Sequence, residues 1–165
     1  MKTEVIEYVK ERYSEESARF SHIESKSGQM LGLLSALFVF LGAAVSFRKD
    51  SLFEPCTNLD WAILLSLFAT SIFLAISWRT ALAALKLGEC PVPKKDIENS
   101  DYLRTASDEE AFSQIVDCYV DTTRLLTPIV DAKARFLGMS YNTLVISAYL
   151  SALFISLVIA REFLS

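Results

Sequence analysis

The chain has 165 residues, of which 52% are hydrophobic, and a mean hydropathy of +0.34, which is too apolar for an ordinary soluble domain. The formal net charge of −4 argues against a protein that coats duplex nucleic acid, because neutralising phosphates takes a broad basic surface. Cys56, Cys90, Cys118 and the single His22 form no motif at metal-ligand or disulfide spacing. We therefore expect a membrane protein without a metal site or another cofactor.

The first 26 residues mix acidic and basic side chains and contain neither proline nor glycine. Val5, Val9, Tyr13 and Phe20 fall near one stripe among these charges, as in an amphipathic helix. No apolar core followed by a cleavage site occurs here, so the segment is not predicted to be a signal peptide. We expect one continuous helix from about residue 3 to residue 47.

Three runs without charged side chains follow one another along the chain, at residues 27–47, 61–78 and 136–160. At about 1.5 Å per residue, a helix over any of them crosses a hydrocarbon core of roughly 30 Å. A buried core helix of a soluble protein is the alternative for a single run. Three such runs in so short a chain leave too little polar chain to cover them. We predict an all-α integral membrane protein with three transmembrane helices.

The distribution of Lys and Arg predicts the orientation, because cytoplasmic segments carry the excess of these residues. Residues 1–26 contain five of them and residues 79–135 contain eight, whereas residues 48–60 contain two and residues 161–165 one. The amino terminus and the segment 79–135 are therefore expected inside, as a cytoplasmic amphipathic helix and a cytoplasmic helical region. The loop 48–60 and the carboxyl terminus are expected outside.

Helix boundaries in the segment 79–135 follow from capping signals. The second helix is expected to continue to Lys86, because Gly88 and the nearby prolines stop it. Residues 91–106 are predicted to be a loop. Ser107 with Glu110 three positions later is a capping-box signature, so the next helix should begin near residue 108.

That last cytoplasmic helix carries an apolar stripe of roughly heptad spacing, which favours packing against a partner helix of the same chain or of another subunit. Pro128 is expected to kink it. The stripe consists of Phe112, Ile115, Val116, Tyr119, Leu126, Ile129 and Val130.

Small and hydroxyl-bearing residues form stripes within the spans. In the first span they include Gly28 and Gly32 in a G-x-x-x-G spacing, followed by Ser35, Gly42, Ala43 and Ser46. In the third span they are Ser140, Thr143, Ser147 and Ser151. Interhelical packing is one interpretation of the third-span stripe, and a pore lining in an oligomer is the other. No acid pair, nucleophile with base, or metal cluster lies at membrane depth, so no catalytic residue is predicted.

An acid-x-Lys-small pattern leads into two of the spans, with Glu24 and Lys26 before the first and Asp131 and Lys133 before the third. Two positions apart on a helix, the acid and the lysine point about 200° from each other, so they do not pair within one helix. One interpretation is that they link neighbouring helices. The other is that the lysines extend to the lipid headgroups.

These features together resemble the transmembrane effectors of bacterial antiphage systems, a group that includes the Pycsar transmembrane effectors, the SLATT proteins and the Hailong effector. The shared pattern is a charged amphipathic lead-in, the acid-x-Lys-small motif, a Pro-rich break (CPVPKKD), an acidic helix with a tyrosine (DEEAFSQIVDCYVD) and a last lysine-containing motif (DAKARFLG). The resemblance covers nearly the whole chain as architecture, through short motifs. Ser27 stands where the Pycsar motif D-x-K-A has alanine, which leaves the subgroup open.

The resemblance implies a homo-oligomer, for instance a tetramer, that disrupts the integrity or potential of the bacterial inner membrane. It also implies control by a nucleotide or oligonucleotide made by a partner nucleotidyltransferase or cyclase. The alternative is a non-conducting adaptor that recruits a partner through its cytoplasmic helices.

An anionic signal would need cations near the inner ends of the spans, and an aromatic ring on which a base can stack. For each cation, a role in fixing the membrane orientation alone is the alternative. The candidate residues for binding the signal are Lys26, Arg79, Lys133, Arg135, Arg19 and Tyr119.

Overall fold

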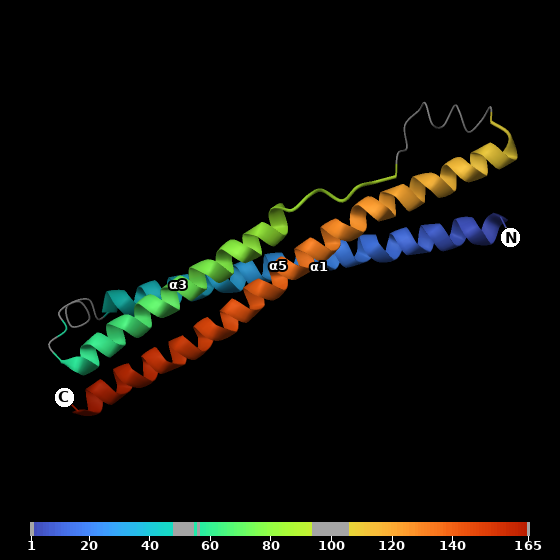
Figure 1. Cartoon of the computed structure of the whole chain (residues 1–165). Helices are drawn as coiled ribbons and strands as arrows, with labels where there is room; N and C mark the ends of the chain where they lie inside the picture. The colour runs from blue at the N-terminus through green and yellow to red at the C-terminus, as the bar shows by residue number, and fades with distance from the viewer. Residues whose placement is uncertain (1, 48–54, 56, 94–105, 165) are drawn as a thin grey trace. The chain divides into compact units, whose positions relative to one another are not determined.

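The computed structural model describes residues 2–47, 55, 57–93 and 106–164. The secondary structure of this part of the chain consists of three α-helices, α1 (Lys2–Phe47), α3 (Asn58–Lys86) and α5 (Asp108–Leu164) (Figure 1). Each of them contains a stretch that is long and apolar enough to cross a membrane. The prediction of an all-helical protein with three helices of membrane-spanning length is confirmed.

The helix ends lie where the capping signals predicted them. Helix α1 is unbroken over 46 residues. Helix α3 ends at Lys86, and Gly88 adopts the left-handed conformation with φ of 55°. A Cβ atom at position 88 would also lie only 3.2 Å from Cγ2 of Ile129, so glycine suits this site on both grounds. Most of the predicted loops, residues 48–60 and 91–106, lies outside the described residues.

Helix α5 begins with the predicted capping box. The Ser107 backbone N–H and hydroxyl donate to Oε2 of Glu110 over 3.1 and 2.9 Å, and the Glu110 N–H donates to Oγ of Ser107 over 3.4 Å. The helix then continues through Pro128 to Leu164 without a change of helix type. A continuous α5 therefore joins the amphipathic segment to the third apolar segment.

The capping box makes the start of α5 sensitive to acid. Hydrogen bonds from the side chain and backbone of Ser107 hold the pKa of Glu110 below its ordinary value of 4.5. The folded helix thus favours ionised Glu110. The stabilisation that this carboxylate gives to the start of α5 is complete above pH 4.5 and is lost as the pH falls through the lowered pKa. We expect faster amide exchange at residues 108–111 in acid, after correction for intrinsic exchange rates. Ser107→Ala should exchange fast at neutral pH and lose this pH dependence.

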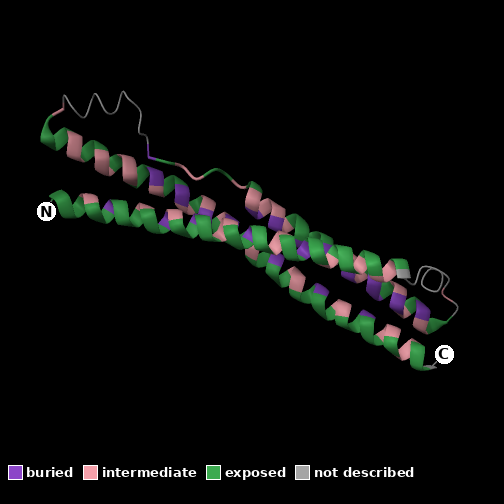
Figure 2. Cartoon of the chain, turned by 180° about the vertical axis from the view of Figure 1, so that it is seen from behind, coloured by how far each residue is buried: buried purple, intermediate pink, exposed green. Residues whose placement is uncertain are grey.

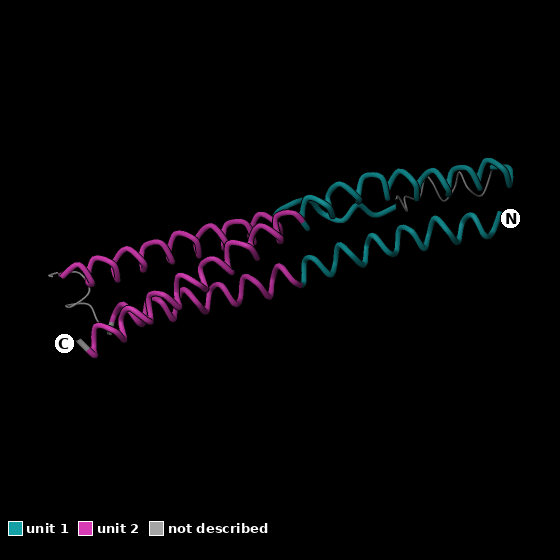
Figure 3. Tube along the Cα trace, turned by 60° about the horizontal axis from the view of Figure 1, so that its bottom comes forward, with its two compact units in different colours: residues 1–25, 86–134 teal, residues 26–85, 135–165 magenta. Residues whose placement is uncertain are grey.

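The chain forms two compact units, which Figure 3 distinguishes by colour. Unit 1 contains Met1–Ser25 and Lys86–Ala134, and unit 2 contains Lys26–Leu85 and Arg135–Ser165. In unit 1, the first part of α1 packs against the first part of α5 around a core of Phe20, Leu126 and Val130. The stripe on α5 thus finds a partner helix within its own chain at this core.

Unit 2 contains the apolar segments of all three helices. One of its cores is formed by Ile63, Leu67 and Phe154, and the other by Leu34, Leu74 and Ala81. Large apolar side chains are also exposed, among them Val39 and Tyr149 at 74% and 75%. Figure 2 shows that exposed positions occur along all three helices. Such an apolar exterior is unfavourable in water and suits the hydrocarbon of a bilayer.

Candidate functional site

Lys133 of α5 is the centre of a charged contact in unit 1. Its side chain is 0% exposed, and its ammonium Nζ donates to Oε1 of Glu24 over 2.8 Å. The same nitrogen lies 4.1 Å from the ring centroid of Phe20, a distance at which a cation is attracted by the ring face. Lys133 is therefore held by α1 and does not extend to solvent. The acid of the first motif binds the lysine of the second, so the interpretation that these motifs link neighbouring helices is confirmed for this pair, whereas Lys26 of the first motif is exposed.

Arg19 makes a second ionic link between α1 and α5. Its guanidinium donates to Glu16 over 2.9 and 3.1 Å, and lies 3.7 Å from the carboxylate of Asp131. The carboxylate of Glu16 is buried, whereas the side chain of Arg19 is 53% exposed. Arg19 and Lys133 thus already bind carboxylates. An anionic ligand at this place would compete with Glu16 and Asp131 for Arg19 and with Glu24 for Lys133.

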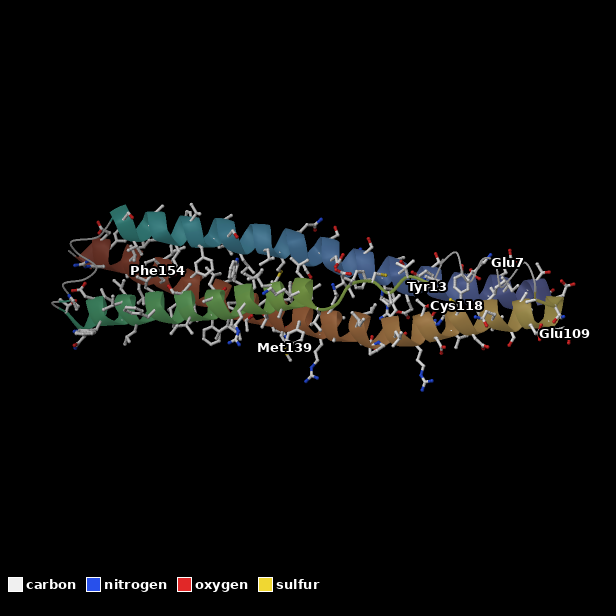
Figure 4. The ribbon with its side chains drawn as sticks, turned by 90° about the horizontal axis from the view of Figure 1, so that it is seen from above. Glu7, Tyr13, Glu109, Cys118, Met139 and Phe154 are labelled. Carbon is white, nitrogen blue, oxygen red and sulfur yellow. The ribbon has the colours of Figure 1, made fainter. Side chains whose placement is uncertain are left out.

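Tyr119 of α5 takes part in an aromatic contact in the same unit. Its ring meets the ring of Tyr13 edge to face, with centroids 5.9 Å apart and planes at 67°. The Tyr13 hydroxyl donates to the carbonyl oxygen of Pro91 over 3.2 Å, which ties the segment after α3 to α1. Burial raises the pKa of the Tyr13 phenol, and Cys90 and Tyr119 beside it add to the shift. Tyr13 is labelled in Figure 4.

The six candidate signal-binding residues are divided between the two units. Arg19, Tyr119 and Lys133 belong to unit 1, whereas Lys26, Arg79 and Arg135 belong to unit 2. The latter three side chains are exposed. Neither unit therefore contains all six, and the role of this set in signal binding stays a prediction.

Sequence reasoning proposed these cations but missed the groups that hold them. Glu16, Phe20 and Glu24 follow one another at intervals of four positions along one face of α1, where Glu16 and Phe20 are buried and Glu24 is half-buried. This helical spacing was the available signal. It could not show which of the many acids of α1 would meet Lys133.

Comparisons with protein-family models, curated proteins and solved structures find no match to this chain.

The hydroxyl stripe of the third span contributes to packing in unit 2. The hydroxyl of Ser77 lies 2.8 Å from the carbonyl oxygen of Ser140, and the hydroxyl of Ser140 lies 2.7 Å from the carbonyl oxygen of Ser77. The two hydroxyl oxygens are 3.1 Å apart. Ser147 is buried as well, while Thr143 and Ser151 are half-buried. For Ser140 the geometry matches the interhelical-packing interpretation, and the pore-lining role of the stripe stays a prediction.

In the part of the chain that the structure describes, nothing packs against the glycines of the small-residue stripe of the first span. A Cβ atom added to Gly28, Gly32 or Gly42 would meet no atom within 4 Å beyond its own stretch of helix. Ser35 and Ser46 are exposed on the same helix. At about 100° per residue these five positions lie within roughly 40° of one line along α1. This side of α1, which we call the small face, is open to another helix.

An ion pair between buried Asp60 and half-buried Arg161 links α3 to α5 in unit 2. Asp60, 4% exposed, lies in the first turn of α3, and its Oδ1 atom is 2.8 Å from Nε of Arg161 near the end of α5. Its Oδ2 atom accepts hydrogen bonds from the backbone N–H and hydroxyl of Thr57 over 3.0 and 2.9 Å. Thr57 and Asp60 thus form a capping box that sequence inspection had overlooked, although the T-x-x-D spacing signals it.

Proposed function

We propose that this chain is the non-enzymatic subunit of a homo-oligomeric membrane effector that disrupts the potential or integrity of the bacterial inner membrane. The observation that carries the proposal is the small face of α1, because such faces let two helices approach closely in lipid and no described residue of the chain packs against its glycines. Three helices of spanning length give the subunit its place in the bilayer.

The proposed orientation places unit 1 in the cytoplasm and the carboxyl terminus outside, as the excess of Lys and Arg in residues 1–26 and 79–135 favours. In this orientation, the exposed cations Lys26, Arg79 and Arg135 face the cytoplasmic headgroup region. They attract an anionic nucleotide or oligonucleotide to the inner ends of the spans.

Control by the signal requires that it binds one arrangement of the helices more tightly than another. The contacts of Lys133 with Glu24 and of Arg19 with Asp131 supply such a difference, because phosphate competes with these carboxylates for the cations. A base stacking on Tyr119 would add affinity and would disturb its contact with Tyr13. The signal thus changes the pairing of α1 with α5 in unit 1, and the change passes along both helices into their apolar segments.

Membrane potential in growing bacteria tests this function. The full-length protein is expressed with a voltage-sensitive dye, with and without a co-expressed nucleotidyltransferase or cyclase. We expect a depolarisation that depends on the enzyme. Gly32→Leu should abolish both the depolarisation and the oligomer detected by native mass spectrometry, because a large side chain keeps the helices apart. Ala75→Leu, at an exposed position of α3, is the matched control and should keep both.

Two further outcomes distinguish the alternatives. An oligomer that leaves the potential intact under all conditions would contradict the effector and favour the adaptor. A response that is unchanged in Lys26→Gln with Lys133→Gln would contradict the signal site alone, with Lys10→Gln at an exposed lysine of α1 as the control for loss of charge.

A further inference from the structure

A cavity of about 560 Å³ lies within unit 2 and is lined by α1, α3 and α5. The hollow arises on α5, where four small residues occupy two successive turns of one face, namely Ser147, Ala148, Ser151 and Ala152. Larger residues such as Leu37 of α1 and Phe154 of α5 complete the walls, and Phe154 is labelled in Figure 4. The volume is in the range of sites that bind small organic molecules.

The chemistry of the lining selects an apolar occupant. No lining residue is charged. The hydroxyls of Thr70, Ser147 and Ser151 donate to carbonyl oxygens of their own helices, each over 2.8 Å. Their protons are thereby used, so the lining offers no free side-chain donor to a polar or anionic ligand. A nucleotide does not suit this cavity, whereas a hydrocarbon chain does.

The cavity is reachable from the outside of unit 2. Phe40, Ile155 and Ile159 belong to the lining and are also exposed, at 66%, 47% and 50%. In a bilayer these residues contact acyl chains. An empty cavity would forgo dispersion contacts with its walls, whereas a chain that enters makes more close contacts than it does among mobile lipids.

A second copy of the protein is a less suitable occupant. The cavity is lined on α1 by Leu37, Leu41 and Ala44, among others. At 100° per residue, these positions lie about 170° around the helix from the small face, which is the surface of α1 best suited to another helix. A copy docked on the small face would leave the cavity to lipid.

We infer that this cavity is a binding site for one acyl chain of a bilayer phospholipid. The inference rests on the part of the proposed function that places the three helices in a bilayer. It does not need the oligomer, the nucleotide signal or the depolarisation.

The test uses the full-length protein reconstituted in phosphatidylethanolamine–phosphatidylglycerol vesicles that contain a phospholipid with a photoactivatable diazirine on its acyl chain. Peptide mapping after irradiation locates the label. We expect enrichment at the cavity residues of α5 over exposed residues of the same helix outside it, such as Tyr149 and Leu153. Ala148→Phe with Ala152→Phe fills the hollow and should reduce cavity labelling severalfold. Leu153→Phe, outside the lining, is the matched control and should leave labelling unchanged.

Uniform labelling around α5 in the wild-type protein would overturn the inference, and so would cavity labelling that the filling substitutions do not lower. Crosslinks from the cavity to a second copy would overturn it in favour of a protein occupant. If the double variant fails to fold, as judged by circular dichroism, the smaller change Ala152→Leu is used, with the same expectation of reduced labelling. If the wild-type protein causes no depolarisation in bacteria but its cavity residues are labelled preferentially, the result contradicts the proposed function and supports this site.

Discussion

Replacing Glu24 with alanine is expected to destabilise the packing of α1 against α5 in unit 1 by about 2–3 kcal/mol. The substitution leaves the ammonium of Lys133 fully buried without the carboxylate that lies 2.8 Å from it. Removing one partner of a buried ion pair costs about 3–5 kcal/mol, and the cost here is expected at or slightly below the low end of this range because the side chain of Glu24 is 41% exposed. The contact with Phe20 offsets only a part of the loss, because a cation–π contact is worth about 2 kcal/mol when desolvated.

The matched variant removes both charges. Glu24→Leu with Lys133→Met replaces the ion pair by apolar side chains of similar length, and such replacements are often neutral or stabilising. We expect this double variant to be more stable than Glu24→Ala. Glu15→Ala, which removes an exposed acid of α1 that pairs with Arg12 over 3.5 Å, should have little effect.

Amide hydrogen exchange measures the effect locally, because it reports the opening of individual helices in the intact protein. Glu24→Ala should accelerate exchange at residues 108–134, where α5 belongs to unit 1, and change residues 58–85 of α3 little. Wild-type protection in Glu24→Ala would show that Lys133 finds another partner, and would contradict the central role given to this pair.

Replacing Asp60 with alanine is expected to cost unit 2 about 3 kcal/mol. Two losses combine: Arg161 loses the carboxylate 2.8 Å from its Nε atom, and α3 loses the acidic half of its capping box with Thr57. The cap alone contributes about 1 kcal/mol. Arg161 recovers some of the remainder because its side chain is 29% exposed and can extend to solvent at the end of α5.

Asp60→Asn separates the two contributions. The amide still accepts hydrogen bonds from Thr57, but it carries no charge for Arg161. Its cost should be that of the ion pair, and Arg161→Gln should cost a similar amount. Thermal unfolding of the detergent-solubilised protein, followed by circular dichroism, ranks the three variants. An Asp60→Ala variant as stable as the wild type would contradict both roles of this residue.

Much of the helical framework could be read from local sequence. Charge-free length predicted the three apolar stretches, and the Ser107–Glu110 box and Gly88 predicted where α5 begins and α3 ends. These features are local because a helix is made by hydrogen bonds between residues four apart, and its ends are set by the few residues that cap them.

The candidate site was predictable only in part. The sequence singled out Lys133 and Glu24 because of their motifs, yet they are 109 positions apart and nothing in the spacing pairs them. Likewise, Ser140 belongs to the stripe predicted in the third span, and the structure joins its hydroxyl to that of Ser77 in α3. The cavity beside Ser147 arises from the same cause, because its walls come from three helices.

The sequence by itself determined that this protein is helical, that it has three stretches apolar enough to span a membrane, and where α3 ends and α5 begins. Only the tertiary structure decided that Lys133 is buried against Glu24, that no described residue packs on the glycines of the small face of α1, and that a cavity opens beside α5. The physical reason is that capping and hydropathy act between near neighbours. The partner of a side chain depends on which faces of distant helices meet.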